Sequence, residues 1–549
     1  MSATPDAHPA PPSERWRESL DALPLVDTLL GHLTPGQAVH VHKLAGSAKS
    51  LIAAELRKRT GRSVLFITPG EEAADAARMD LERFLGEPVL YLAEHQVRPY
   101  DVKPAHTEVA ATRLETLTHL ATHRDGVVVA TARAVMEKVA GPELLKKHLI
   151  RFAPGTAVDV DDLLTRLTYL GYNRCAAVEE VGDYALRGGI LDIYSLGGSH
   201  PIRIEVEYDE VASIREFDAY TQRSVRTLDE AVIIPRHELL LDQDRIDLAI
   251  LELREANREA GDELADSFDT EVHPAGIERI AGRLHQELTA VTEYLPENAI
   301  VILDEPGLVI SRLETHWEQV TQLHGEVSSE FPYVSPPGDL YLNPETLQAA
   351  LRTRPLLRFS SLTPESANAI TVSVRSHPPD AFGRKLELWR NYLSGLAARG
   401  TRMVMFCDNE GQRRRLHELL VEEDIPIELV LGVLSAGFVL EDAGLAVFTD
   451  HEFFSRPRRR KRARRFQSGF GLKELKTLKP GSFIVHVEHG IARYLGLTRI
   501  EVNGHLTDVL QLEYQGKDKL YVPIDQLDLI QRYSSEEGRA PALSRLGGT

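Results

Sequence analysis

A lysine–serine pair near the start of the chain has the residue types of a phosphate-binding loop. Lys49 and Ser50 match the last two positions of the pattern G-x-x-x-x-G-K-[ST]. In that pattern the glycines let backbone N–H groups surround phosphates, the lysine contacts the outer phosphate oxygens, and the hydroxyl binds magnesium. Here Lys43 and Ala48 occupy the two glycine positions, although Gly46 lies between them. Side chains at those positions would crowd the phosphates, so the pattern indicates a degenerate loop.

An acidic pair farther along the chain has the form of the other half of such a site. Asp304 and Glu305 end the apolar run Val301–Leu303, as in strands that position magnesium and water for nucleotide hydrolysis. Ordinary strands also end in acidic residues where they emerge into solvent, and no arginine-bearing partner domain is recognisable. We therefore expect a degenerate nucleotide site, no catalytic residues and no cofactor in this chain. The site would comprise Gly46, Lys49, Ser50, Asp304 and Glu305.

Length and composition predict several folded domains in a soluble, cytoplasmic protein. A chain of 549 residues exceeds the roughly 100–200 residues of one domain. Its 63 basic and 82 acidic residues give a formal charge of −19, so the average surface repels nucleic acid. Two cysteines, Cys175 and Cys407, are too few for a disulfide framework or a zinc site. No apolar run reaches the roughly 20 residues of a membrane helix, and we expect a monomer without a membrane partner.

A multi-domain α/β fold is expected to position these residues. Buried-strand patterns at Ser63–Thr68 and Gly126–Thr131 alternate with helical patterns such as Glu71–Phe84, which is typical of a parallel sheet. Short alternating runs then replace this rhythm, and a strand pattern returns at Ala299–Leu303, so an α+β insert is expected to split the domain. The predicted units are a disordered tail (1–14), the first half of an α/β domain (15–145), the insert (146–235), the second half of the α/β domain (236–376), a second small α/β domain (377–453), a basic linker (454–476), a small β-rich domain (477–535) and a tail (536–549).

Two patterns in the last hundred residues have simple structural interpretations. Eight of the ten residues in Arg456–Arg465 are basic, and such a run favours a solvated tether over contact with the DNA backbone. His486 and His489 stand beside Glu488 on a strand-to-turn segment, where histidines are more often structural, so no metal site is predicted. The alternative DNA contact would use Arg458, Arg459, Arg460, Lys461 and Arg462.

Three motifs in the first half of the chain carry a family resemblance. They are Arg98–Asp101 followed by Pro104, Glu108 and Arg113; Gly182–Ile193; and Arg203–Glu205 with Ser213–Asp218. Together they resemble the module that the excision-repair protein UvrB shares with the transcription-repair coupling factor (Mfd). The degenerate phosphate loop favours the coupling factor, because UvrB resembles it but keeps an intact loop.

Two motifs near the end extend the resemblance. Lys479–Gly496 and Lys519–Ile530 are similar to the polymerase-interacting domain of coupling factors, which CarD-type regulators share and UvrB lacks. The resemblance covers nearly the whole chain and stops at Leu546–Thr549; in the family, a helicase-like DNA translocase and an autoinhibitory C-terminal domain come next. It implies a split RecA-like domain and a Tudor/SH3-like β-rich domain. It also assigns ATP, magnesium and most DNA binding to the translocase motor, so this chain is not expected to be an enzyme.

The resemblance implies that the insert binds UvrA through an arginine-bearing surface. A planar guanidinium group suits this task because it pairs with carboxylates through two parallel hydrogen bonds. Val206 and Glu207 stand where some relatives have two phenylalanines, and Tyr208 is expected to substitute for them. Ion pairs within the insert are the alternative role for the arginines. The predicted UvrA-binding residues are Arg187, Arg203, Glu207 and Tyr208.

The resemblance also implies that the β-rich domain adds a strand to the edge of a domain of the RNA polymerase β subunit. Side-chain alternation puts Thr498 and Ile500 on one face of that strand, with Ile500 at the hydrophobic contact. Packing of Ile500 in the core of its own domain is the alternative. The predicted polymerase-binding residues are Leu497, Thr498, Arg499, Ile500 and Glu501.

The resulting hypothesis is a scaffold for transcription-coupled DNA repair that binds stalled RNA polymerase and recruits UvrA of nucleotide excision repair. In the full family this scaffold is coupled to ATP-dependent release of polymerase from damaged DNA. Two other hypotheses stay open. A UvrB-like, DNA-dependent ATPase would bind ATP with micromolar affinity, and a CarD-like transcription regulator without a repair role would bind polymerase and not UvrA.

Overall fold

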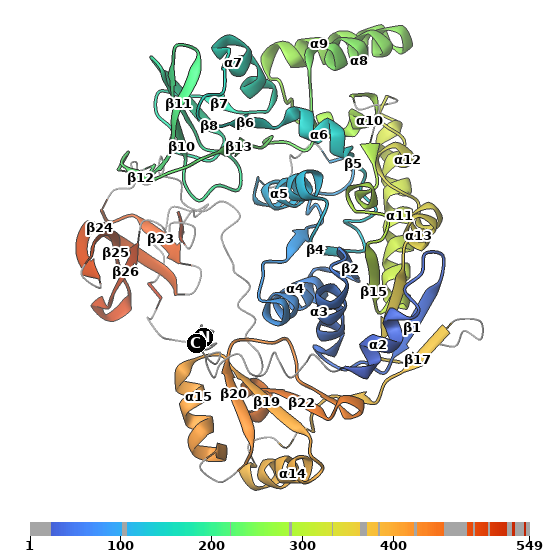
Figure 1. The fold of residues 1–549 in the computed structure, drawn as a ribbon. Helices are drawn as coiled ribbons and strands as arrows, with labels where there is room; N and C mark the ends of the chain where they lie inside the picture. Colours follow the sequence, from blue (N-terminus) through green and yellow to red (C-terminus); the bar gives the residue numbers. More distant parts are fainter. Residues whose placement is uncertain are drawn as a thin grey trace, which may run out of the picture. The chain divides into compact units, whose positions relative to one another are not determined.

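The structure is a computed structural model of the chain (Figure 1). The chain divides into two compact units, residues 1–149 with 234–458 and residues 150–233 with 459–549. The predicted N-terminal tail (1–14) and the basic run Arg456–Arg465 lie outside the described residues. The structure describes residues 23–101, 107–219, 221–284, 288–331, 333–362, 370–380, 382, 385–421, 425–454, 480–486, 489–502, 505–523, 530–532 and 543–544.

The first unit contains a seven-stranded parallel sheet whose strands come from both sides of the insert. In order across the sheet, the strands are β17 (Ile370–Ser373), β1 (Ala38–His42), β16 (Leu356–Ser360), β15 (Ile300–Asp304), β2 (Val64–Thr68), β4 (Val127–Thr131) and β3 (Leu90–Leu92). All neighbouring pairs run parallel. Every residue of β2 and of β4 is buried, as in sheets that are covered on both faces. Because β15 lies between β2 and β16, the chain returns into the same sheet after the insert.

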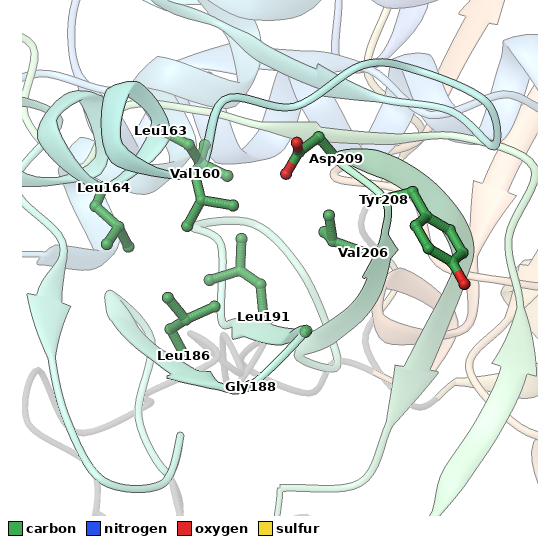
Figure 2. A pocket seen from close by; sticks show the side chains of 10 residues that line it. Val160, Leu163, Leu164, Leu186, Gly188, Leu191, Val206, Tyr208 and Asp209 are labelled. Carbon is green, nitrogen blue, oxygen red and sulfur yellow. The ribbon is translucent and has the colours of Figure 1, made fainter.

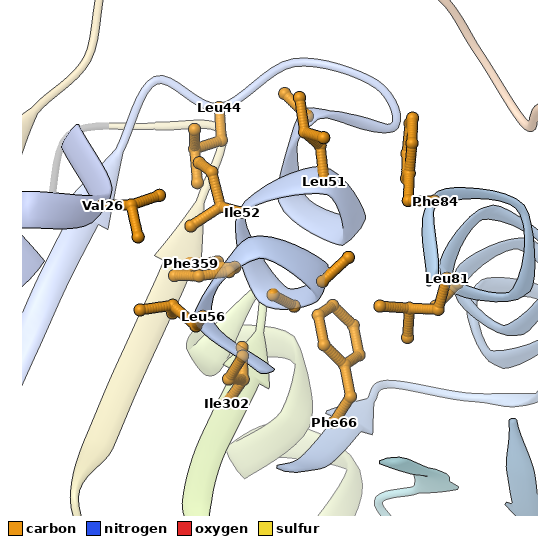
Figure 3. Close-up of a cluster of buried hydrophobic side chains, with 14 of the residues drawn as sticks. Val26, Leu44, Leu51, Ile52, Leu56, Phe66, Leu81, Phe84, Ile302 and Phe359 are labelled. Atoms are coloured by element: carbon orange, nitrogen blue, oxygen red, sulfur yellow. The ribbon is translucent and has the colours of Figure 1, made fainter. Parts of the chain in front are cut away.

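Two helices cover one face of this sheet. They are α3 (Ala48–Thr60), which follows β1, and α4 (Glu71–Leu85), which follows β2. Burial of one large apolar side chain contributes about 1.5–3 kcal/mol, so this packing fixes the start of α3, where Lys49 and Ser50 lie. Figure 3 shows the side chains that meet there, namely Leu51, Ile52, Leu56, Leu81 and Phe84 from the helices and Phe66, Ile302 and Phe359 from β2, β15 and β16.

The first unit also contains further helices and one short strand pair. β5 (Val139–Ala140) pairs with β14 (Leu288–Thr289) in antiparallel fashion. Single 3-10 turns lie at Ile277–Ile280 and Val291–Tyr294. The helices are α2 (Pro24–Leu30), α5 (Thr107–His123), α6 (Pro142–His148), α8 (Gln243–Ala256), α9 (Arg258–Thr270), α10 (Ala281–Leu284), α11 (Pro306–Ser328), α12 (Pro337–Leu340) and α13 (Pro344–Arg352).

A smaller α/β domain completes the first unit. Its sheet has the order β18 (Ser376–His377), β21 (Phe438–Leu440), β22 (Leu445–Thr449), β19 (Arg402–Cys407) and β20 (Ile427–Leu431). Its helices are α14 (Leu386–Ala398), α15 (Glu410–Leu416) and α16 (Asp450–Phe454). Trp389 of α14 is fully buried and contacts the rings of Phe448 and Phe453. The apolar side chains of α14 that recur at helical spacing, Trp389, Leu393 and Leu396, therefore lie in the core of this domain.

The insert in the second unit is a six-stranded sheet covered on one face by α7 (Val160–Tyr169). The strands, in sheet order, are β12 (Ser224–Thr227), β11 (Glu210–Phe217), β10 (Ile202–Glu207), β9 (Ile190–Ile193), β8 (Asp183–Arg187) and β7 (Asn173–Arg174). At its base, β6 (Ile150–Phe152) pairs with β13 (Ala231–Ile233), so the entering and leaving chain segments are held together. This pairing closes the insert at the two points where the chain enters and leaves it.

The last domain in the second unit is a five-stranded antiparallel sheet. Its order is β26 (Lys519–Pro523), β25 (His505–Glu513), β24 (Gly490–Val502), β23 (Phe483–His486) and β27 (Ile530–Arg532). A bulge between Tyr494 and Gly496 interrupts the long strand β24, and such bulges bend a strand. Residues 503–504, which join β24 to β25, lie outside the described residues, but Val502 and His505 pair on their two sides. The several sheets and helices confirm the prediction of a multi-domain α/β chain.

Candidate functional sites

The predicted nucleotide site is closed by an ion-pair network of its own residues. The Lys49 Nζ atom lies 2.6 Å from Asp304 Oδ1 and 2.6 Å from Glu305 Oε1. Glu305 also accepts hydrogen bonds from the backbone N–H (2.9 Å) and hydroxyl (2.6 Å) of Ser361. The lysine and both carboxylates that the sequence indicates therefore lie together, and the carboxylates contact the ammonium group that would contact phosphate oxygens in an intact loop.

Within this network, the charges of Lys49 and Glu305 are stabilised and that of Asp304 is not. Burial disfavours the charged ammonium of Lys49, but the neighbouring carboxylates outweigh burial and hold the Lys49 pKa above its usual value. Burial raises the pKa of Asp304, whereas for Glu305 the hydrogen bonds from Lys49 and Ser361 overcome burial and lower the pKa. The Lys49 charge is therefore neutralised without an anionic ligand.

The loop before Lys49 keeps the backbone shape of its pattern at the first glycine position. Lys43 has a left-handed φ of +61°, a conformation that glycine adopts most readily, and its side chain is exposed. Ala48 and Ser50 are buried in the start of α3. The side chain at position 43 is therefore exposed, and the methyl group at position 48 is buried.

In the insert, both predicted arginines converge on one buried carboxylate. Asp192 of β9 is fully buried, and its Oδ1 and Oδ2 atoms accept from Arg203 Nε (2.7 Å) and Nη2 (2.9 Å). Arg187 donates to the same Oδ2 through Nη2 at 2.8 Å. The Arg203 guanidinium also lies over the Phe217 ring at 4.4 Å. The intradomain ion pairs that the sequence left as an alternative are therefore present.

The two arginines differ in how much of the side chain remains accessible. The Arg203 side chain is 19% exposed and uses both sides of its guanidinium fork on Asp192, whereas the Arg187 side chain is 52% exposed. The hydrogen bonds that Arg203 donates to Asp192 raise the Arg203 pKa, so the guanidinium group stays charged. Arg203 is thus held inside its own domain, and about half of the Arg187 side chain remains accessible.

A strained turn carries the predicted aromatic residue. Tyr208 and Asp209 join β10 to β11 and have φ values of +53° and +62°. Two consecutive positive φ values fit a type I′ hairpin turn, which favours Asn and Gly. A bulky residue there costs roughly 1–3 kcal/mol, and such costs cluster at functional sites. Tyr208 is 99% exposed, and Glu207 beside it is exposed as well, so both predicted residues lie at the free end of the hairpin.

A small apolar pocket opens beside this hairpin end (Figure 2). Its volume is about 200 Å³, enough for one large side chain. The sequence did not predict it, because an alternating strand pattern indicates burial and cannot reveal a gap between a helix and a sheet. The pocket is lined by residues of α7, of the β8–β9 and β10–β11 hairpins and of their turns, namely Val160, Leu163, Leu164, Leu186, Gly188, Gly189, Leu191, Val206, Tyr208 and Asp209.

The predicted polymerase-binding strand is the far end of β24. β23 pairs with Gly490–Arg493, whereas β25 pairs with the strand as far as Val502. Among the described strands, the part of β24 beyond Tyr494 therefore has a neighbour on one edge only. Leu497 is 43% exposed, and the side chains of Ile500 and Glu501 lie outside the described part of the chain.

One charged cluster was not found from the sequence. Asp408 follows β19, and Asp450 and His451 follow the adjacent parallel strand β22. His451 Nε2 lies 2.7 Å from Asp408 Oδ2 and 3.9 Å from Asp450 Oδ1. The cluster could have been predicted, because Asp408 and Asp450 each follow an apolar strand pattern directly. The imidazole–carboxylate hydrogen bond accounts for the arrangement.

Comparison with known proteins relates two of these domains to known families. The family model described as UvrB interaction domain matches residues 150–239, and the model described as CarD-like/TRCF RID domain matches residues 478–534. Over 95% of its length the chain is 30% identical to the transcription-repair-coupling factor of Myxococcus xanthus, and it covers 48% of that protein. The chain is thus similar in sequence to the transcription-repair-coupling factors.

Other coupling factors give the same picture. The chain is 27% identical to the factor of Staphylococcus haemolyticus over 95% of its length, and 27% identical to that of Staphylococcus aureus strain USA300 over 92%. It spans about half the length of the curated coupling factors it matches. These matches confirm the resemblance drawn from the motifs. Among the described helices, none has the length and apolar character needed to cross a bilayer.

Proposed function

We propose that this chain couples transcription to nucleotide excision repair by binding stalled RNA polymerase and UvrA. The observation that carries the proposal is the presence of a UvrB interaction domain (150–239) and a CarD-like/TRCF RID domain (478–534) in one chain. We further propose that the intact coupling factor releases polymerase from damaged DNA with ATP and magnesium, in the cytoplasm. This chain would act as a monomeric scaffold, and the basic run Arg458–Arg462 would add at most a backbone contact with DNA.

The polymerase contact is proposed to be an added strand. Strand addition needs an unpaired edge, because backbone N–H and C=O groups supply the affinity. The part of β24 beyond Tyr494, which has one described strand neighbour, suits that role, and its Leu497 is exposed. In the proposed contact the Tudor/SH3-like domain pairs Leu497–Glu501 with a sheet edge of the polymerase β subunit, with Ile500 in the apolar contact.

The UvrA contact is proposed to combine charge with an apolar pocket. Arg187 keeps donors for a carboxylate of the partner, while Arg203 fixes Asp192 and thereby the position of Arg187. Tyr208 and Glu207 stand at the end of the neighbouring hairpin, next to the 200 Å³ pocket. A partner segment with an acidic residue and a large apolar side chain would fit this surface.

The seven-stranded domain is proposed to be a RecA-like domain without nucleotide chemistry. Its lysine is neutralised by Asp304 and Glu305, and Ala48 occupies a glycine position of the loop. No cofactor is assigned to this chain, and ATP belongs to the motor of the intact family members.

Capture of both partners at once tests the proposal. The immobilised 549-residue chain is incubated with purified RNA polymerase and purified UvrA, and bound proteins are quantified. We expect one complex that contains both partners. Polymerase binding without UvrA would indicate a CarD-like regulator, and binding of neither would overturn the scaffold function.

A further inference from the structure

The loop of the predicted nucleotide site is covered by a turn of the smaller α/β domain. Ser47 donates from its backbone N–H (3.3 Å) and from its hydroxyl (2.7 Å) to the Ala436 carbonyl oxygen. The backbone N–H of Ala45 donates to the Ser376 hydroxyl at 3.3 Å. The loop Lys43–Ser47 therefore makes hydrogen bonds with protein groups where its pattern would bind phosphate.

Two glycines allow this close approach. Gly46 has a φ of +50°, and a Cβ atom there would overlap the carbonyl oxygen of Gly437. A Cβ atom on Gly437 would lie 2.6 Å from the Val447 carbonyl oxygen and would overlap the Glu452 carboxylate. Glycine at position 46 is thus explained by contact with a second protein backbone, in place of contact with a phosphate.

A second contact beside the loop joins the same two domains. Asp80 of α4 is 1% exposed, and its carboxylate accepts from the Ser435 backbone N–H at 2.6 Å and from the Ser435 hydroxyl. Arg83, one turn later, donates to the Leu431 carbonyl oxygen and lies over the Phe406 ring at 5.3 Å. Leaving a buried carboxylate without such partners is costly. The turn is therefore held at two places, by Ser47 of the loop and by Asp80 of α4.

We propose that Lys43–Ser47 is an internal docking site that holds the smaller α/β domain through its turn Ser435–Gly437. The ion pairs of Lys49 with Asp304 and Glu305 remove the need for an anion, and the turn occupies the space in front of the loop. Nucleotide binding at this loop and docking of the domain exclude each other. This inference does not rest on the proposed partners.

Hydrogen exchange of the 549-residue chain, measured by mass spectrometry, tests the docking site. The Ser47 and Ser435 amides donate across the joint, whereas the Gly437 amide donates to Glu452 of its own domain at 2.7 Å and serves as an internal control. In Gly46→Ala we expect peptides 43–50 and 433–436 to exchange at least about tenfold faster, the effect of losing roughly 1.4 kcal/mol of docking free energy. Exchange in β2 should stay unchanged.

Gly61→Ala is the matched control. Gly61 also has a positive φ, +63°, but a Cβ atom there meets nothing within 4 Å. Equal exchange in the two variants would overturn the proposal, because backbone strain alone would then explain the result. If Gly46→Ala does not fold, Ser435→Ala is the variant that tests the docking site. It removes the hydrogen bond from the Ser435 hydroxyl to Asp80 and adds no atom that could clash. Retained protection of both peptides in Ser435→Ala would also overturn it.

Discussion

At the scale of single residues, Asp192 determines what the two predicted arginines can do. Its buried carboxylate receives three hydrogen bonds from Arg187 and Arg203. A lone aspartate in an alternating strand pattern looks like a surface residue, so the pattern predicts no role for it. Family resemblance predicts both arginines as binding residues. That Arg203 is mostly buried and Arg187 is accessible depends on packing between strands, which no local sequence pattern contains.

Separate replacement of the two arginines should separate binding from stability. Arg187→Ala is expected to lower UvrA affinity by about 1.5–3 kcal/mol, the range for hydrogen bonds to charged groups, and to leave the insert folded. Arg203→Ala should destabilise the insert by about 3–5 kcal/mol, because Asp192 keeps its buried charge with a weaker partner set. Calorimetric titration with UvrA and hydrogen exchange of β9 measure the two effects. Equal loss of stability in both variants would contradict the assignment.

At the scale of elements, buried strands were the most predictable features. The patterns Ser63–Thr68, Gly126–Thr131 and Ala299–Leu303 correspond to β2, β4 and β15, each within one residue at either end. Continuous apolar runs are reliable because both faces of a parallel sheet are covered. The order of strands in the sheet and the contact of Ser47 with Ala436, 389 positions away, are long-range features that local patterns do not contain.

Helix α11 provides an element-scale prediction about pH. His316 of α11 is 2% exposed, and burial together with the Arg133 charge lowers its pKa to about 4. In the unfolded chain the imidazole of this histidine is protonated near pH 6.5. Between pH 6.5 and 4 the unfolded chain therefore binds more protons than the folded chain, and the free energy of unfolding falls as the pH is lowered. The loss should approach about 1.4 kcal/mol per pH unit. In His316→Phe, the stability of α11 measured by hydrogen exchange should depend less on pH over that range. An unchanged pH dependence would mean that other groups cause it.

Strand β24 provides a prediction about docking. Ile500→Arg places a charge in the proposed apolar contact and should abolish capture of RNA polymerase while UvrA capture continues. The matched control is Arg493→Ala, because Arg493 lies on the same strand where both β23 and β25 pair with it. Circular dichroism checks that the variants remain folded. Co-purification of Ile500→Arg with the polymerase β subunit would show that docking uses another surface.

At the scale of the whole molecule, we expect a chain that binds partners without local ATP chemistry. Two segments match interaction-domain models, residues 150–239 and 478–534. In the α/β unit of the same chain, the degenerate phosphate loop contacts protein through Ser47 and Ala436. The formal charge of −19 is consistent with this, because nucleotides and DNA are both repelled by the average surface.

Titration with magnesium ATP is the corresponding whole-molecule test. We expect no saturation at micromolar ATP, because triphosphate would have to approach Asp304 and Glu305, displace them from Lys49 and open the contact between Ser47 and Ala436. The double variant Asp304→Asn with Glu305→Gln removes the two charges while Ala48 and the docked turn stay in place. Its affinity should therefore also remain weaker than micromolar. A micromolar Kd for the unaltered chain would instead support a UvrB-like ATPase. A micromolar Kd for the double variant alone would mean that the two carboxylates, and not the docked domain, exclude the nucleotide.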